Sequence, residues 1–374
     1  MLFVSILALY IRYLGRDVLS NDLETCLSSW HDEIINAGPG IGALRSYTGD
    51  YAITYAFIIW ILSKLPISFM YSVKIVSIIF DFGLAVMIGA IVKFFKPEDR
   101  TGFCLGYCVT LLLPNVFLNS SYWGQCDSIY TFFLFASFLC YLQKKYPLMM
   151  LLLGVAFSFK LQSIFLLPFI LIAYWLQREF SILQFFIIPA VMLVMNIPSM
   201  IAGYSPMIAF TQYVRQATGY PWLYYFYPNL YLFFQARPYY LFSVSAIFLT
   251  MTALLAFVVL LVKKDVRLEY DNLLPILLWT SYTCVFFLPS MHERYGYFPE
   301  LIAVIWALVN FRKTGFAVAM MLCVFPKYLF ALDFIGNPSW VQLVTVIGNT
   351  LLYMYFTCSL WKLLFQAEGR KCNA

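Results

Sequence analysis

The sequence predicts an all-α polytopic membrane protein with about 12 transmembrane helices, and three observations lead to this prediction. Of the 374 residues, 63% are hydrophobic and 11% are charged, whereas soluble globular chains average about 45–50% apolar and about 25% charged residues. Tyr, Phe and Trp make up 20% of the chain, which suits a protein with many rings at membrane interfaces. Apolar stretches recur along the whole length, so we expect a single transmembrane domain over residues 1–374.

A membrane helix needs about 20 mostly apolar residues, and several of the candidate stretches are shorter than that. Lys160 and Gln162 interrupt the apolar run 147–177, so we expect two short helices there. The predicted spans are 1–14, 72–92, 102–118, 128–143, 147–159, 163–177, 181–201, 240–262, 273–289, 297–310, 314–332 and 340–364.

The apolar segment 51–65 is short for a full crossing, and we expect it to be a juxtamembrane helix in a first extracytoplasmic loop, 15–71. Lys and Arg collect on the cytoplasmic side of membrane proteins. This choice places the compact basic clusters on one side, with both termini in the cytoplasm. The net charge of +6 then reflects topology and not affinity for nucleic acid. A catalytic helical module (72–201), an extracytoplasmic loop (202–239) and C-terminal helices (240–364) would follow. The basic clusters are Lys93, Lys96, Arg100, Lys144, Lys145, Arg178, Lys263, Lys264, Arg267, Arg312, Lys313, Lys362, Arg370 and Lys371.

Four polar groups fall on the opposite, extracytoplasmic side, where ionisable residues near the membrane mark function by default. The first contains Ser20, Asp22 and Glu24. Ser20 can be a helix cap, whereas Asp22 is suited to act as a general base. Asp22 and Glu24 also offer two hard oxygens to a divalent metal, although two residues do not make a metal site.

The second group, Asn119-Ser-Ser-Tyr-Trp-Gly-Gln-Cys-Asp127, lies between two strongly apolar stretches and combines Trp123, Gln125 and Asp127. Asp127 can simply cap the next helix, but a plain turn does not need all three side chains. In the third group, Lys160 and Gln162 interrupt an apolar run. Lys160 can extend along the helix to the interface or bind a phosphate.

The fourth group is His292-Glu293-Arg294-Tyr295, between two predicted spans. A turn closed by its own salt bridge is the simpler interpretation, and a binding site is the alternative. No Cys or His residues have zinc-site spacing, and no Gly-rich phosphate loop indicates a nucleotide site.

Together these groups resemble the GT-C membrane glycosyltransferases, and within them the mannosyltransferases of the GPI-anchor pathway and their bacterial relatives. The stretches Trp123–Ile129 and Met291–Tyr295 are the most specific landmarks. The resemblance implies a GT-C-like bundle, a polyprenyl- or dolichyl-phosphate sugar donor, and transfer of a hexose such as mannose to a glycan or glycolipid acceptor. Transfer would occur on the extracytoplasmic or lumenal side, and a bacterial cell membrane is favoured over an ER membrane. The Asp-x-Asp of the GPI enzymes reads Asp22-x-Glu24 here, which leaves metal use open.

The predicted mechanism is an inverting displacement with Asp22 as the general base. Lys160 and Arg294 would stabilise the leaving lipid phosphate, since a fixed cation acts where negative charge develops. A secondary transporter or a lipid-linked-sugar flippase is the competing interpretation. The other predicted substrate-binding residues are Gln162, His292, Glu293, Gln125, Asp127, Trp123 and Tyr295.

Overall fold

The computed structural model describes residues 1–365, and its regular structure is almost entirely helical, as predicted. Within these residues, four helices are long and apolar enough to cross a membrane, or five if a bent pair counts as one span. The four are α4 (Phe69–Phe95), Phe311–Ala331, α13 (Tyr239–Lys263) and α17 (Ser339–Phe365). These helices support a membrane protein, and the full count of twelve spans stays a prediction. Arg370 and Lys371 lie outside the described residues.

The chain divides into two compact units. Unit 1 contains residues 1–163, 181–220 and 331–334, and unit 2 contains 164–180, 221–330 and the segment from 335 onward. The predicted single domain is not tested by this division, and each unit is described by itself.

Unit 1 is built around α4, which packs against α5 and α7, while α7 packs against α8 and α8 against α10. Glycines allow two of these approaches. A Cβ atom on Gly106 would lie 2.9 Å from the Cα of Gly89, and one on Gly154 would lie 2.8 Å from the Val191 side chain. The remaining helices of unit 1 are α1 (Leu2–Leu14), η1 (Asp22–Leu27), α2 (Ser28–Asn36), η2 (Ile41–Ser46), α3 (Ile53–Leu62), α5 (Gly102–Leu112), α6 (Pro114–Phe117), η3 (Leu118–Tyr122), α7 (Asp127–Leu142), α8 (Tyr146–Phe159), η5 (Ile182–Phe186), α10 (Ile187–Met195), α11 (Ile197–Ile201) and α12 (Ile208–Thr218).

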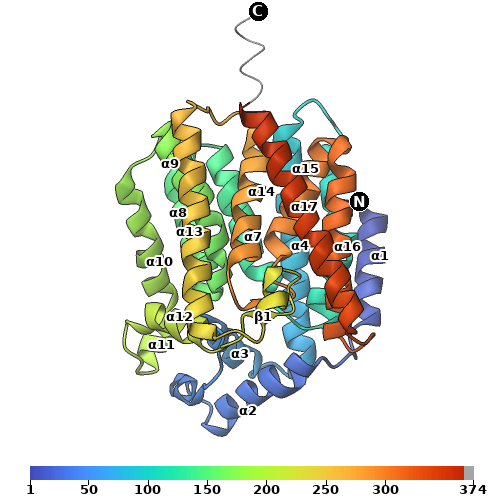
Figure 1. The fold of residues 1–374 in the computed structure, drawn as a ribbon. Coiled ribbons are helices and arrows are strands. Elements are labelled where there is room, and N and C mark those ends of the chain that lie inside the picture. The colour runs from blue at the N-terminus through green and yellow to red at the C-terminus, as the bar shows by residue number, and fades with distance from the viewer. Residues whose placement is uncertain (366–374) are drawn as a thin grey trace, which may run out of the picture. The chain divides into compact units, whose positions relative to one another are not determined.

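The predicted first loop, 15–71, contains short helices, as expected of a juxtamembrane segment. Figure 1 shows α2 and α3 lying across one end of the long helix α4, and both contact it. The break predicted near Lys160 is confirmed. Helix α8 ends at Phe159, Lys160 is extended (φ −149°, ψ 141°), and a 3-10 turn, η4 (Leu161–Leu166), precedes α9 (Leu167–Gln177).

One predicted boundary is wrong. We expected a single span over 102–118 and a loop from Asn119, but the chain bends by 53° between α5 and α6 and stays helical to Tyr122. Pro114 explains the bend, because proline lacks an N–H and its ring clashes with the preceding turn. The last turn, η3, is π-helical. Asn119 therefore lies on a buried helix and not in a loop.

Unit 2 is centred on α14 (Tyr270–Phe287), whose residues are buried continuously from Leu273 to Phe286. It packs against α15, α13, α17 and α9. Two short strands, β1 (Tyr224–Tyr225) and β2 (Met291–His292), pair in parallel. The other helices are η6 (Leu230–Phe234), α15 (Tyr297–Val309), η7 (Phe311–Lys313) and α16 (Thr314–Ala331).

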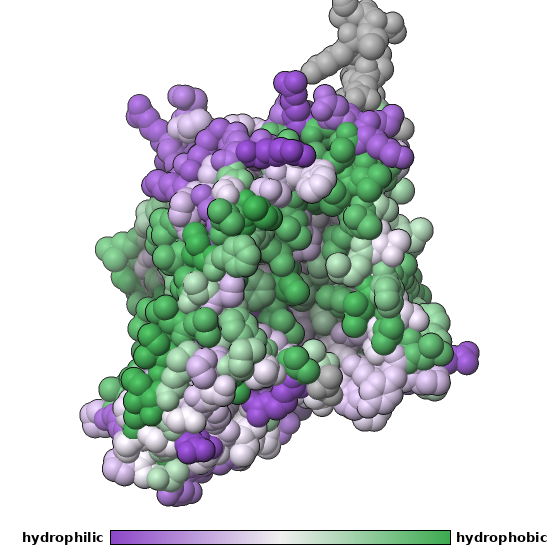
Figure 2. Space-filling model, turned by 90° about the vertical axis from the view of Figure 1, so that its left-hand side faces the viewer, coloured by the Kyte–Doolittle hydropathy of each residue, from purple (hydrophilic) through white to green (hydrophobic). Residues whose placement is uncertain are grey.

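Apolar side chains remain exposed along several helices, which is expected of a surface that faces lipid. Figure 2 looks onto the side that carries α10 and α11 and shows hydrophobic surface there. Phe186, Val194 and Ile201 are 61–69% exposed. Exposed apolar area of this extent is unusual in soluble monomers and agrees with a membrane location.

Candidate functional site

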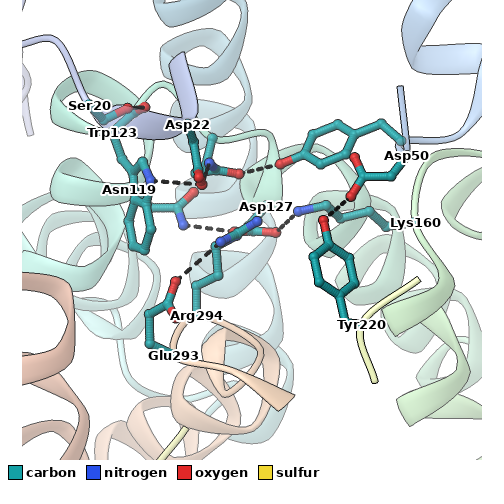
Figure 3. Close-up of polar contacts among 12 residues, drawn as sticks. Ser20, Asp22, Asp50, Asn119, Trp123, Asp127, Lys160, Tyr220, Glu293 and Arg294 are labelled. Atoms are coloured by element: carbon teal, nitrogen blue, oxygen red, sulfur yellow. Dashed lines mark hydrogen bonds and ion pairs between the residues drawn. The ribbon is translucent and has the colours of Figure 1, made fainter. Parts of the chain in front are cut away.

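Asp22 lies at the start of η1, directly after the loop that follows the first helix. Its Oδ2 accepts hydrogen bonds from the indole Nε1 of Trp123 (3.1 Å) and the amide Nε2 of Gln125 (2.7 Å) (Figure 3). Ser20 supplies the expected cap, since its Oγ accepts from the Leu23 N–H (3.2 Å). The same Oγ donates to the Trp123 carbonyl (2.7 Å). Asp22 is thus held in one orientation by a segment about 100 residues away in sequence.

The turn Trp123–Cys126 presents these donors. Gly124 has φ +76°, a conformation that favours glycine. The Gln125 N–H donates to the Asn119 carbonyl (2.9 Å), and Ser77 on α4 donates to the Gln125 carbonyl (2.7 Å). Trp123 and Gln125 are almost completely buried, whereas Asp22 is half-buried. The two donor side chains are therefore held in place by burial. The Asp22 carboxylate that accepts from them remains partly accessible to a bound molecule.

Tyr51 extends this arrangement. Its hydroxyl donates to Gln125 Oε1 (2.5 Å), which leaves the amide nitrogen to face Asp22. The Tyr51 ring also belongs to an aromatic wall, with centroids 5.1 Å from Trp30 and 5.4 Å from Tyr55. Tyr51 was not among the site residues predicted from the sequence. We call Ser20, Asp22, Tyr51, Trp123 and Gln125 the Asp22 cluster.

Lys160 and Asp127 form a buried ion pair beside this cluster. Lys160 Nζ lies 2.5 Å from Asp127 Oδ1, and Asn119 Nδ2 donates to Asp127 Oδ2 (2.8 Å). The ammonium also lies 4.9 Å from the Tyr51 ring centroid. Lys160 is 5% exposed, so it does not reach outward to an interface. A carboxylate partner for Lys160 was not predicted, because Asp127 is 33 residues away in the sequence.

The loop that carries Tyr51 is anchored by α12 and the residues after it. Arg215 donates to the Gly49 carbonyl (2.7 Å), and the Tyr220 hydroxyl donates to Asp50 (Figure 3). Burial, together with the nearby Asp50 carboxylate, raises the pKa of Tyr47 well above its usual value. Tyr47 therefore stays protonated and donates to the Tyr51 carbonyl (3.2 Å). These bonds hold the loop that carries Tyr51 in place.

Two buried cations tie the first helix to its neighbours, and sequence reasoning assigned neither of them to the site. Arg12 Nη2 lies 2.8 Å from Asp81 Oδ2, and Ser120 donates to the same oxygen (2.5 Å). Lys74 on α4 donates to the carbonyls of Gly15 (2.9 Å), Arg16 (3.0 Å) and Val18 (2.7 Å), just before the Asp22 cluster. A lysine in an apolar stretch was a usable signal, but its backbone partners were not readable from sequence.

The fourth predicted group lies in unit 2. Arg294 Nη1 is 3.2 Å from Glu293 Oε1, and both residues are buried. His292 belongs to β2, with its ring centroid 4.1 Å from Tyr225 and 4.9 Å from Tyr295. The salt bridge expected of a simple turn is therefore present. The structure brings Asp22, Trp123, Gln125, Asp127 and Lys160 together in unit 1, and His292, Glu293, Arg294 and Tyr295 together in unit 2.

The two remaining predicted residues are Gln162 and Glu24, and neither is fully buried. Gln162 is half-buried in η4, and Glu24 is exposed on η1. Within residues 1–365, no group of three or more His, Cys, Asp or Glu side chains is placed to hold a metal ion. Asp22 and Glu24 thus stay a two-residue metal prediction.

Comparison with known proteins adds no family to this description. No protein-family model matches the chain, and no curated protein matches it either. The interpretation of the site therefore depends on its geometry and on the sequence pattern.

Proposed function

We propose that this chain is a multi-pass membrane glycosyltransferase. It would transfer a hexose from a polyprenyl- or dolichyl-phosphate donor to a glycan or glycolipid acceptor, with inversion. The observation that carries the proposal is the half-buried Asp22 carboxylate, fixed by two rigid neutral donors beside an aromatic wall. Aromatic faces suit sugar rings, and an oriented carboxylate suits proton abstraction.

The reaction follows from these positions. The acceptor hydroxyl would give its proton to Asp22 while its oxygen attacks the anomeric carbon. The bond from that carbon to the phosphate oxygen breaks, and the lipid phosphate leaves with the electron pair. Direct attack from the opposite face inverts the anomeric configuration.

Lys160 and Arg294 remain the proposed cations for the leaving phosphate, in a revised form. Each has a carboxylate partner in the structure, Asp127 and Glu293 respectively. A phosphate would therefore compete with or join an existing pair. Charge-assisted hydrogen bonds to an ionised phosphate are about twice as strong as neutral ones, which supports donation from a paired cation.

The topology is part of the proposal. The twelve apolar segments would cross the membrane, with the Asp22 cluster on the extracytoplasmic side. Introduced cysteines near 30–50 and 205–230 should then react with an impermeant reagent added outside, and those at 95–100 or 263–270 should not. Labelling at 95–100 from outside would reverse the assignment of sides.

The decisive experiment is turnover in detergent, where transport has no meaning. Purified protein is mixed with a radiolabelled polyprenyl-phosphate hexose and candidate acceptors. Asp22→Asn keeps the size of the side chain but removes the base, so turnover should fall by roughly 100-fold or more with donor binding largely kept. Asp17→Asn is a matched control, since Asp17 is exposed in the same loop and pairs with Arg16.

Two results would count against this proposal. Absence of transfer from every lipid-phosphate sugar tested would remove the proposed activity. Full turnover in Asp22→Asn would move the base to another carboxylate.

A secondary transporter is the second candidate, and one observation favours it. The bent helix pair α5–α6 continues into the π-helical segment η3, which carries buried Asn119 and Ser120, and broken helices with polar residues form binding sites in transporters. Substrate flux into proteoliposomes, without turnover in detergent, would support this function instead.

A further inference from the structure

Unit 2 contains a pocket of about 310 Å³ at one end of its helices, and none of the predicted site residues lines it. It lies where η7 joins α15 to α16, next to the last turns of α17. Its principal lining residues are Trp306, Arg312, Lys313, Phe316, Tyr355 and Ser359.

The pocket has a basic rim and an aromatic floor. Trp306, Phe316 and Phe356 are buried and pack together, with the Trp306 centroid 5.9 Å from Phe316 and 5.5 Å from Phe356. Lys313 Nζ lies 4.7 Å from the Trp306 ring centroid, at the rim. Arg312, also at the rim, is exposed. Such a site suits an anionic group attached to an apolar body.

Helix α17 adds polar groups to the same side. Tyr355 and Ser359 line the pocket and are four residues apart, so they share one face of the helix. Lys362 follows three residues later on that face and is exposed. Two hydroxyl groups and two cations therefore line the pocket, and Lys362 adds a third cation on the same face of α17.

The pocket lies at the end of two membrane-length helices. The helix that begins at Phe311 and α17 both have the length and hydropathy of membrane spans. The pocket is at the start of the first and the end of the second. Exposed apolar side chains continue along both helices, including Leu322 (62%) and Leu351 (61%).

We propose that this pocket binds the phosphate headgroup of an anionic membrane phospholipid. Its acyl chains would lie along α16 and the helix α17. The charge complementarity favours an anion, and the apolar surface below the rim favours a lipid over a soluble phosphate. The inference depends on membrane insertion and not on glycosyl transfer.

This site is separate from the proposed donor phosphate. Helix α15 has 13 residues, so its ends are about 20 Å apart at 1.5 Å per residue. Arg294 precedes the first end, and Arg312 follows the second. One phosphate cannot contact both residues.

The test measures lipid binding by native mass spectrometry of the purified chain. The probes are phosphatidylglycerol, the zwitterionic phosphatidylcholine, and soluble glycerol 3-phosphate as a competitor. The double variant Arg312→Gln with Lys313→Gln should reduce phosphatidylglycerol binding by about tenfold or more, since each basic residue near a membrane surface contributes about a factor of five. Lys263→Gln with Lys264→Gln is the matched control, because it removes an equal charge at the end of α13, which does not line the pocket.

A second variant separates the pocket from its charge. Gly315 lines the pocket, and a Cβ atom there would meet nothing within 4 Å. Gly315→Leu should therefore fill the opening and reduce phosphatidylglycerol binding with the charge unchanged, whereas Gly315→Ala should fold and bind nearly as the unaltered chain does.

Three results would overturn the proposal. Equal loss in the Lys263 and Lys264 variant would mean that diffuse charge attracts the lipid. Unchanged binding in Gly315→Leu would place the lipid elsewhere. Competition by glycerol 3-phosphate at concentrations similar to those of the lipid would identify a site for a soluble phosphate.

Discussion

The Asp22 cluster and the buried pair of Arg12 and Asp81 both involve a carboxylate in unit 1, yet they differ in exposure and in partners. Asp81 is fully buried, and a guanidinium holds it through two nitrogens at 2.8 and 2.9 Å. Asp22 is half-buried and receives neutral N–H donors from Trp123 and Gln125. The first carboxylate lies in a buried ion pair, whereas the second is half-buried and is oriented by the N–H groups of Trp123 and Gln125.

This difference suggests different roles: the Arg12–Asp81 pair stabilises the helices, and Asp22 is the proposed catalytic base. Arg12 also donates to the carbonyls of Ala8 (3.1 Å) and Leu111 (3.0 Å), so the pair joins α1, α4 and α5. Lys74 on α4 donates to carbonyls of the loop before Asp22 and so attaches that loop to α4. The buried charges therefore hold the segment that presents the half-buried carboxylate, and variants of the two regions should change different quantities.

The largest effect is expected from Arg12→Met. It leaves the Asp81 carboxylate buried without its guanidinium, and breaking a buried pair from one side costs about 3–5 kcal/mol of the free energy of unfolding. Thermal unfolding of the purified protein in detergent measures this loss. Arg12→Met with Asp81→Leu should recover most of the stability, since an apolar replacement of both partners is often neutral. A double variant as unstable as the single one would contradict a role based on the pair.

A smaller effect on stability is expected at Lys160 and Asp127. This buried pair stabilises the fold, and Lys160 is also a proposed ligand of the lipid phosphate. Asp127→Asn and Lys160→Met should each lower the free energy of unfolding by about 3 kcal/mol, at the low end of the cost of breaking a buried pair, because Asn119 still donates to residue 127 in either variant. Their effects on lipid-phosphate binding should differ. Lys160→Met should weaken it by about tenfold through the loss of one charge-assisted contact, whereas Asp127→Asn should retain it.

A titration of both variants with a polyprenyl phosphate measures this difference. Unchanged affinity in Lys160→Met would leave the ion pair with a structural role alone. Arg178→Met serves as the control, since Arg178 follows α9 in unit 2 and lies near the Trp175 ring.

The next effect is expected from Lys74→Met, which removes three hydrogen bonds to the loop before Asp22. We expect turnover to fall by about tenfold, with little change in KM for the donor, because a displaced general base affects kcat first. Lys74→Arg keeps the charge and the donors and should restore most of the turnover. Equal loss in both variants would indicate that the site tolerates no change in packing and would remove the positioning role.

The sequence predicted the helices well because their limits are local. Apolar runs end at charged residues, as at Lys160, where the predicted break is found. The bend at Pro114 was missed, because Asn119 and its polar neighbours are typical of a loop when read without their surroundings. In the structure the Asn119 amide donates to Asp127, which is buried on the next helix. A polar stretch can stay helical when a tertiary partner satisfies it.

The candidate site was predictable by residue type but not by partner. Asp22, Trp123, Gln125 and Asp127 were chosen because polar side chains beside apolar stretches are costly. Their pairing depends on contacts across long sequence separations: 103 residues from Gln125 to Asp22 and 69 from Arg12 to Asp81. Charge and spacing in one sequence do not determine such contacts. Arg12 was therefore not among the predicted site residues.

The smallest effect is expected from Tyr51→Phe, which tests whether the orientation of Asp22 matters. The variant keeps the ring beside Trp30 but removes the hydroxyl that donates to Gln125 Oε1. The amide can then rotate and present its oxygen to the carboxylate, which repels it. One hydrogen bond is worth about 0.5–1.5 kcal/mol, so turnover should fall by about twofold to tenfold with stability nearly unchanged.

Tyr47→Phe is the control for this variant, since its hydroxyl donates to the Tyr51 carbonyl on the same aromatic wall and not to Gln125. Initial rates at saturating donor compare the two variants. If both lose turnover equally, the wall contributes through packing alone. If Tyr51→Phe alone loses turnover, the hydrogen bonds from Tyr51 through Gln125 to Asp22 set the orientation of the base, which is the property that distinguishes this carboxylate from Asp81.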